Sequence, residues 1–355
     1  MISRYFLFFM LVVLLAAGGC KKTDNQTQII YFYTGSGAAG DVIDFTVNQS
    51  GLGYSIYNET YKQYDNGYFT TYSGELNGLY KIFARGSFYY GVELPGQVFG
   101  GCFPTARTEN SLSYGVSLQT NTSNPLISGN YVYLRISNAA INGSTVNREW
   151  GILSILPNGT WMKQGYCNAP GILPMLMPDE YTGPVPPLNM ADSGTWIVDT
   201  VSPGRFQMTR LNKTDTVSGF PFATDSGAVF VMDLGFRKGF LFGLKLLDGN
   251  INTMKGSYGY ADVQYDASTG GGKFAVSDSS QALDWWRGNA YGKITNGLFG
   301  GVNQAGVLKN VFFAKNVDLN GETVDFYSVV SGPFFMEFQF RQNNFRSYGI
   351  GARLP

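Results

Sequence analysis

The sequence predicts an all-β protein of antiparallel sheets, arranged as tandem β-sandwich or small-barrel modules in about three weak repeats. From residue 30 onward, short runs rich in Tyr, Phe, Val and Ile are interrupted by Gly, Asn, Asp and Ser about every eight to twelve residues. No stretch of this region keeps a helical period between capping residues. Two aromatic motifs also recur in the same order three times, which favours a repeated module.

The clearest predicted strand covers residues 334–341. Phe334, Met336, Phe338 and Phe340 alternate there with mostly polar residues, which predicts a strand with one buried and one exposed face. Further strands are expected to start at Ile29, Val42, Tyr80, Tyr131, Trp150, Trp196, Val229, Phe240, Tyr258 and Val311.

The repeat rests on two short motifs. An aromatic-x-aromatic triplet is followed downstream by an aromatic-Gly-aliphatic triplet, in the pairs 31–33 and 114–116, 131–133 and 242–244, and 258–260 and 348–350. The alternative is coincidence, since the chain contains 46 Gly and 23 Tyr. The resulting division is a signal segment 1–19, a tether 20–28, and β modules 29–120, 121–250 (with a Pro-rich loop at 170–187) and 251–355.

The first residues predict export from the cytoplasm. Arg4 precedes an uninterrupted apolar run over 6–17, and two glycines stand directly before Cys20. A charged start, a short apolar core and small residues at a cleavage point are typical of a secretory signal, and the run is short for a membrane-spanning helix.

The stretch from Leu15 to Cys20 resembles the lipobox of bacterial lipoproteins. The resemblance implies that Cys20 receives a diacylglycerol thioether, becomes the mature N-terminus and holds the protein on a membrane. The family usually has Leu where this chain has Ala17, so an ordinary secretory signal is the alternative. Lys21 and Lys22 follow in place of an Asp that favours inner-membrane retention, which implies the outer membrane, with a periplasmic or surface-facing orientation.

Composition excludes several kinds of chemistry. The chain has no histidine, so Ser-His-Asp triads, Cys-His dyads and histidine-based zinc sites are impossible. Charged residues are only 14%, with 25 Lys+Arg against 25 Asp+Glu, and such a neutral chain gives no electrostatic reason to expect a nucleic-acid partner. We expect no cofactor and no catalytic residue.

The remaining cysteines form an even pair. If Cys20 is lipidated, Cys102 and Cys167 are left in a compartment where disulfides persist. They either form a disulfide bridge or remain as two buried free thiols, and the sequence leaves both alternatives open. No C-x-x-C pair and no calcium-loop motif occurs in the sequence, so no metal site is predicted.

Three tryptophans are candidate ligand-binding aromatics. Trp285 and Trp286 lie between Asp284 and Arg287, and Trp150 follows Glu149, which would suit stacking on a sugar ring beside an acid. Adjacent strand residues point to opposite sides, so at most one of the paired tryptophans faces a given ligand, and core packing is the plainer interpretation.

These features lead to three hypotheses. The first is a membrane-anchored cell-envelope lipoprotein that acts as a non-catalytic binding or structural module for a glycan, lipid or protein partner. The second is a glycan hydrolase using two carboxylates about 5–9 Å apart. The third is a transmembrane β-barrel, although Pro355 replaces the terminal aromatic usual in that class. The acids available to a hydrolase are Glu149, Asp233, Asp262, Asp266 and Asp284.

Overall fold

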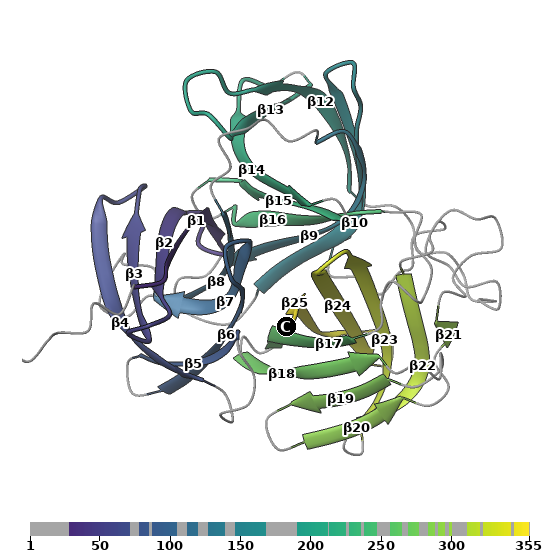
Figure 1. Cartoon of the computed structure of the whole chain (residues 1–355). Helices are drawn as coiled ribbons and strands as arrows, with labels where there is room; N and C mark the ends of the chain where they lie inside the picture. Colours follow the sequence, from purple (N-terminus) through teal and green to yellow (C-terminus); the bar gives the residue numbers. More distant parts are fainter. Residues whose placement is uncertain are drawn as a thin grey trace, which may run out of the picture.

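The chain folds into antiparallel sheets throughout the part that the structure describes (Figure 1). Every regular element there is a β-strand, which confirms the predicted all-β class. Within the same residues no helix has the length and apolar character needed to cross a membrane. The computed structural model describes residues 28–71, 78–84, 87–104, 112–119, 127–138, 146–167, 190–211, 213–224, 227–235, 238–246, 256–264, 269–276, 283–287, 290–294, 298–299, 311–319, 322–341 and 344–354.

The first eight strands close into a barrel. Each strand pairs antiparallel with the next, and the first pairs with the eighth, where Gly37 lies opposite Gly115. The strands of this first barrel are β1 (Ile30–Gly37), β2 (Val42–Asn48), β3 (Gly53–Asn58), β4 (Gln63–Thr71), β5 (Leu79–Ala84), β6 (Ser87–Leu94), β7 (Val98–Pro104) and β8 (Leu112–Gln119).

The next eight strands form a second closed barrel with the same up-and-down order. Its closing pair is β9 with β16, where Tyr133 lies opposite Gly243. The strands of this second barrel are β9 (Gly129–Asn138), β10 (Val146–Ile155), β11 (Thr160–Cys167), β12 (Met190–Val198), β13 (Phe206–Arg210), β14 (Thr216–Thr224), β15 (Gly227–Asp233) and β16 (Phe240–Lys245).

The last nine strands form one open sheet in the order β20-β19-β18-β17-β25-β24-β23-β22-β21. Two closed barrels and this third sheet agree with the predicted small-barrel modules. The strands of the third sheet are β17 (Gly256–Gln264), β18 (Thr269–Val276), β19 (Leu283–Arg287), β20 (Ala290–Ile294), β21 (Leu298–Phe299), β22 (Val311–Leu319), β23 (Glu322–Ser331), β24 (Phe334–Arg341) and β25 (Asn344–Arg353).

The two sequence motifs mark equivalent strands of the three sheets. The aromatic-x-aromatic triplets lie on β1, β9 and β17, and the aromatic-Gly-aliphatic triplets lie on β8, β16 and β25. In each sheet these two strands pair with each other, so the motifs mark the pairing that joins the beginning of a module to its end. The register is not constant, because Gly243 lies opposite Tyr133 whereas Gly349 lies opposite Asp262.

Apolar side chains fill the inside of the first barrel. On β2, Ile43, Phe45 and Val47 are buried and alternate with partly exposed residues, as expected for a strand with one face on a core. The rings of Phe45 and Phe99 lie 4.2 Å apart between centroids, and Phe99 also packs beside Tyr33. This interior is therefore an aromatic core.

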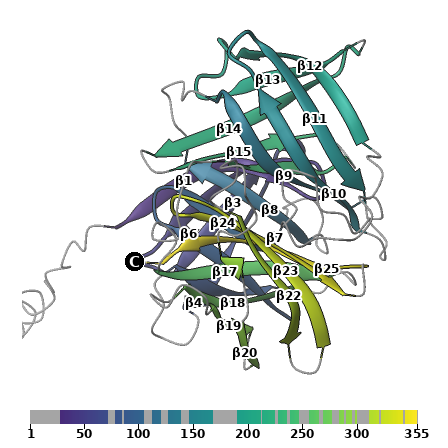
Figure 2. The ribbon, with the colours of Figure 1, turned by 90° about the vertical axis from the view of Figure 1, so that its right-hand side faces the viewer.

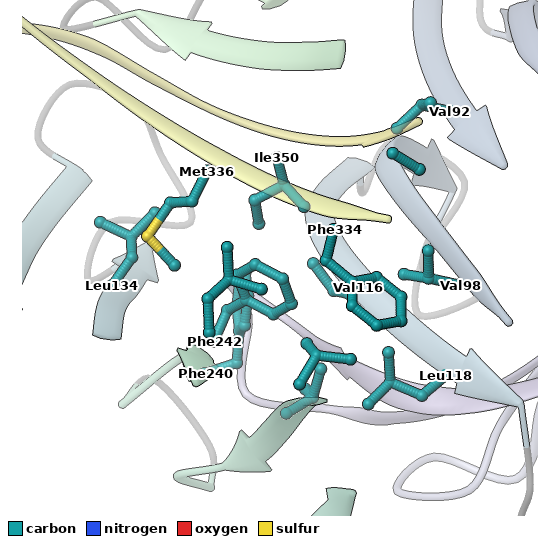
Figure 3. Packing of buried hydrophobic residues seen from close by; sticks show 14 of the residues in the cluster. Val92, Val98, Val116, Leu118, Leu134, Phe240, Phe242, Phe334, Met336 and Ile350 are labelled. Carbon is teal, nitrogen blue, oxygen red and sulfur yellow. The ribbon is translucent and has the colours of Figure 1, made fainter. Parts of the chain in front are cut away.

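A second core lies between the three sheets (Figure 3). Its side chains come from the outer walls of both barrels and from the third sheet, so the modules share buried apolar surface and pack against one another (Figure 2). Phe222 of β14 and Phe334 of β24, for example, meet edge to face at 6.0 Å. The residues labelled in Figure 3 are Val92, Val98, Val116, Leu118, Leu134, Phe240, Phe242, Phe334, Met336 and Ile350.

This central core corrects one detail of the predicted strand at 334–341. The bounds match β24, but the predicted exposed face is buried, since Phe335, Glu337 and Gln339 are as inaccessible as Phe334 and Met336. The physical reason is that Phe334 and Met336 pack in the core between modules. Phe335, Glu337 and Gln339 point to the opposite face of β24, the inner face of the third sheet.

Polar contacts also join the modules. Ser36 of β1 donates a hydrogen bond to Asp233 of β15 at 2.9 Å, and the Arg205 guanidinium pairs with Glu59 at 2.8 Å. Burial raises the pKa of Asp233, and the nearby carboxylates of Asp41 and Glu59 act in the same direction. The junction between the two barrels therefore combines hydrogen bonds with crowded acidic groups.

Candidate functional site

The residues that face the inside of the second barrel change from aromatic to charged along the barrel axis. On β9 the inward residues run Tyr131, Tyr133, Arg135, and on β13 they run from Phe206 to Arg210. Alternate strands of an up-and-down barrel run in the same direction, so the aromatic residues gather at one end and the cations at the other. One half of the barrel is thus apolar and the other charged.

Aromatic packing fills the apolar half. The Tyr131 and Phe230 rings meet edge to face, with their centroids 4.8 Å apart, and Phe206 meets the Phe230 ring in the same way at 6.0 Å. The Trp161 indole lies beside them in the same core and donates to the carbonyl oxygen of Thr195 at 3.1 Å. A buried indole with a satisfied N–H is a stable core element, so this half serves as the base of the barrel.

The charged half contains a cavity of about 90 Å³, which we call the cup. Apolar side chains form its inner part and charged side chains surround them, an arrangement typical of small-molecule sites. The apolar lining consists of Leu153, Trp161, Met208, Val217, Met232, Leu234 and Leu241. The charged lining consists of Arg135, Lys163, Asp192, Arg210, Asp215 and Lys238.

Glu149 of β10 lies directly behind the cup and holds two of its cations. It accepts hydrogen bonds from the Tyr133 hydroxyl at 2.5 Å, from Lys163 at 2.5 Å and from Arg135 at 3.1 Å. The side chains of Glu149 and Lys163 are only 2% and 7% exposed, and that of Arg135 is 23% exposed. Burial alone would raise the pKa of Glu149, but Lys163, Tyr133 and Arg135 together lower it below its usual value.

Two further ion pairs lie nearer the solvent. The Arg210 Nε contacts Asp192 at 2.5 Å, and the Lys238 Nζ contacts Asp215 at 3.4 Å. Exposed pairs of this kind contribute little to stability, about 0–1 kcal/mol. Counting Glu149, the described residues at the cup include four cations and three carboxylates, which leaves one positive charge in excess.

The first barrel offers an internal comparison. Its buried Glu93 accepts hydrogen bonds from the hydroxyls of Tyr33 at 2.5 Å and Tyr80 at 2.7 Å and from the Gln49 amide at 2.9 Å. Burial raises the pKa of both tyrosines, and Glu93 adds to the shift. Tyr33 and Tyr133 occupy the same motif position, so one barrel satisfies a buried glutamate with neutral donors where the other uses two cations. The cations of the cup are thus more than a buried carboxylate requires.

The structure places Cys102 and Cys167 on strands, but it describes the contacts of neither side chain. Cys20 lies outside the described residues, as does the Pro-rich loop 170–187. Cys102 lies on β7 of the first barrel opposite Tyr114, and Cys167 lies on β11 of the second barrel opposite Glu149. A bridge between Cys102 and Cys167 would join the two barrels, and it stays a prediction.

The candidate tryptophans do not lie on one element. Trp150 is on β10 of the second barrel, opposite Leu134, whereas Trp285 and Trp286 are on β19 of the third sheet. The side chains of these three tryptophans are outside the described set, so their role as ligand-binding aromatics stays a prediction.

The acids considered for a hydrolase lie in separate environments. Glu149 is ion-paired inside the second barrel, Asp233 is at the junction with the first barrel, and Asp262 is buried on β17. Asp266 and the side chain of Asp284 lie outside the described part. Among the described side chains, no three acids or cysteines come together in a way that would hold a metal ion.

Sequence reasoning missed the cations of the cup. Glu149 was singled out as an acid, but Arg135, Lys163 and Arg210 were not, because they are isolated charges on separate strands. A signal was present, since on β9, β11 and β13 every second residue passes from an aromatic side chain to a cation within two to four positions. That pattern is typical of a barrel with a packed base and a polar mouth.

Comparisons with known proteins assign no family. No family model and no curated protein matches the chain. Among solved structures, the chain is similar to a protein of unknown function from the DUF3598 family of Nostoc punctiforme, with 9% identity and a TM-score of 0.21. That match covers 64% of this chain and 96% of the other. At this TM-score the likeness supports neither a shared fold nor a shared function.

Proposed function

We propose that this chain is a non-catalytic binding protein of the cell envelope, and that the cup of the second barrel receives its ligand. The observation that carries the proposal is the half-filled barrel, in which an apolar floor at Met208 and Met232 opens toward charged side chains. Such combinations of apolar lining with a few placed polar groups are the usual form of a ligand pocket.

The ionisation of Glu149 supports binding in preference to acid catalysis. A glycosidase general acid needs a carboxyl whose pKa is raised, so that it carries a proton near neutral pH. The pKa of Glu149 is lowered, because Lys163 and Arg135 stabilise its charged form. Glu149 is therefore suited to fixing cations in place.

The size of the cup restricts its occupant. At about 90 Å³ it is smaller than the roughly 150 Å³ cavity that admits benzene in another protein. A short apolar group fits this volume, whereas a sugar ring would bind elsewhere, for example on an exposed aromatic surface. The glycan and protein partners expected from the sequence therefore belong outside the cup.

Binding inside the cup is expected to change the NMR signals of the methionine methyl groups that line it. We expect 1-hexanol or hexanoate, added to protein labelled with ¹³C in its methionine methyls, to shift Met208 and Met232 in a saturable way. Met162 provides the matched control, because it lies between Trp161 and Lys163 on β11 but is 48% exposed on the outer wall. If neither these compounds nor the shorter 1-butanol and butanoate move the Met208 and Met232 signals, the proposed binding function is wrong.

Membrane attachment forms the other part of the proposal and rests on the lipobox-like sequence. Only residues 21–29 separate Cys20 from the start of β1 at Ile30, so an acylated protein would hold its first barrel close to the bilayer. Cys20→Ser is expected to remove the fatty-acid mass adduct and to release the chain from the membrane fraction or leave the precursor uncleaved. An acylated, membrane-bound Cys20→Ser protein would contradict the anchor.

A further inference from the structure

We propose that the ligand of the cup is a small amphipathic acid, whose anionic group binds near Arg135 and Lys163 while a short apolar group lies on Met208 and Met232. This inference rests on the proposed binding function and specifies the chemical class of the ligand. Its anionic group is a carboxylate, or a sulfonate or phosphate with the same hydrogen-bonding pattern.

The charge balance of the cup favours an anion. Arg135 and Lys163 share a single carboxylate, that of Glu149. These three side chains together therefore carry one positive charge in excess. Both cations are largely withdrawn from solvent, where an unbalanced charge is costly. A ligand with one negative charge would balance them.

Hydrogen-bond donors of Arg135 and Lys163 also favour an anion. The Arg135 Nη1 donates to Glu149 and the Nη2 contacts the Lys238 carbonyl oxygen at 3.4 Å, but its buried Nε finds no acceptor among the described residues. Lys163 directs one bond to Glu149 and has three N–H groups to offer. Unused donors from two cations can therefore converge on one ligand anion, and an alcohol or an amine would satisfy them less well.

The apolar lining of the cup favours a short hydrocarbon group. Met208, Met232 and Leu241 are buried beneath the charged groups and belong to the apolar core of the barrel. Methionine is unbranched and adapts to irregular ligands, which suits a small hydrocarbon chain. The volume of about 90 Å³ restricts that chain to a few carbons, so the acid must be short or enter only in part.

A set of ligands with one hydrocarbon chain tests the inference. Hexanoate, hexanesulfonate, hexyl phosphate, 1-hexanol and hexylammonium would each be titrated into the full mature chain while the Met208 and Met232 methyl signals are followed. We expect hexanoate to bind at least about tenfold more tightly than 1-hexanol, and hexylammonium to bind weakest. The sulfonate and phosphate arms identify which anion the donors prefer.

The Arg135→Gln variant assigns the effect to the cup. It should weaken hexanoate about tenfold and 1-hexanol much less, whereas Lys213→Gln, an equal change of charge at an exposed position after β13, should change neither. Should Arg135→Gln fail to fold, a salt series on the unaltered protein replaces it, because rising ionic strength should weaken hexanoate and spare 1-hexanol.

The outcomes separate the two proposals. Equal affinity for hexanoate and 1-hexanol, or tighter binding of hexylammonium, would overturn the amphipathic acid and leave the binding function intact. Failure of every six-carbon compound, and of the shorter butanoate and 1-butanol, to move the Met208 and Met232 signals would overturn the binding function, and the inference with it.

Discussion

Replacing Glu149 by leucine is expected to lower the free energy of unfolding by about 3–5 kcal/mol, because it leaves two cations without their shared counter-ion. Lys163 suffers most, since its side chain is only 7% exposed and its Nζ, 5.6 Å from the centre of the Tyr133 ring, would lose the carboxylate that balances its charge. Tyr133 also loses the acceptor for its hydroxyl. Urea unfolding followed by circular dichroism, with hydrogen exchange of the β9–β11 amides, measures the loss and locates it.

A paired variant provides the control for this prediction. Glu149→Leu combined with Lys163→Met removes both buried partners and should recover much of the lost stability, because an apolar pair needs no counter-ion. Glu149→Gln keeps the shape of the side chain, so its free energy of unfolding should lie between those of Glu149→Leu and the double variant. An unfolding midpoint for Glu149→Leu equal to that of the unaltered chain would show that Lys163 and Arg135 find other partners.

The same ion pairs make the second barrel sensitive to acid. The pKa of Glu149 is lower in the folded chain than the value of about 4.3 expected after unfolding. Its contribution to stability is therefore complete above that unfolded value and is lost as the pH falls through the folded pKa. The stability difference between the unaltered chain and Glu149→Leu should shrink on acidification below about pH 4, and a constant difference would contradict this assignment.

The fold class was predictable because its signals are local. Period-two alternation over a few residues defines a strand wherever it occurs, and 334–341 was predicted with the bounds of β24. The burial of Glu337 and Gln339 was not predictable, because it depends on a neighbouring module that packs on the opposite face of the strand. Closure of a sheet into a barrel likewise depends on pairing between β9 and β16, about a hundred residues apart in sequence.

The site was less accessible to sequence reasoning than the fold. Glu149 drew notice as a charged residue next to Trp150, yet its partners Arg135 and Lys163 come from two neighbouring strands and belong to no motif. Barrel closure brings Arg210, at the end of β13, and Lys238, just before β16, to the same mouth from further along the chain. The residues of such a cup occupy alternating positions on several strands. They can be recognised as one site only once the strand register is known.

The glycine of the second motif in the second barrel is expected to be intolerant of any side chain. Gly243 of β16 lies directly opposite Phe230 of β15, and a Cβ at this position would meet the Phe230 ring. That ring cannot retreat, because Tyr131 and Phe206 pack against its other sides. We expect Gly243→Ala to lower the free energy of unfolding by about 2–3 kcal/mol, the cost of overpacking a filled core, measured by urea denaturation.

Phe206 and Gly219 form the same pairing on β13 and β14, so filling a glycine gap with a cross-strand ring is a recurrent device of this barrel. The coupling is testable, since Gly243→Ala together with Phe230→Leu should be less destabilising than the sum of the two single changes by about 1 kcal/mol or more. Gly53→Ala is the matched control. A Cβ there would lie at an ordinary 3.6 Å from its nearest neighbour, so we expect a change within about 0.5 kcal/mol. Strictly additive losses at Gly243 and Phe230 would mean that the ring does not depend on the glycine, and that the aromatic-Gly-aliphatic motif owes its place on the closing strand to some other constraint.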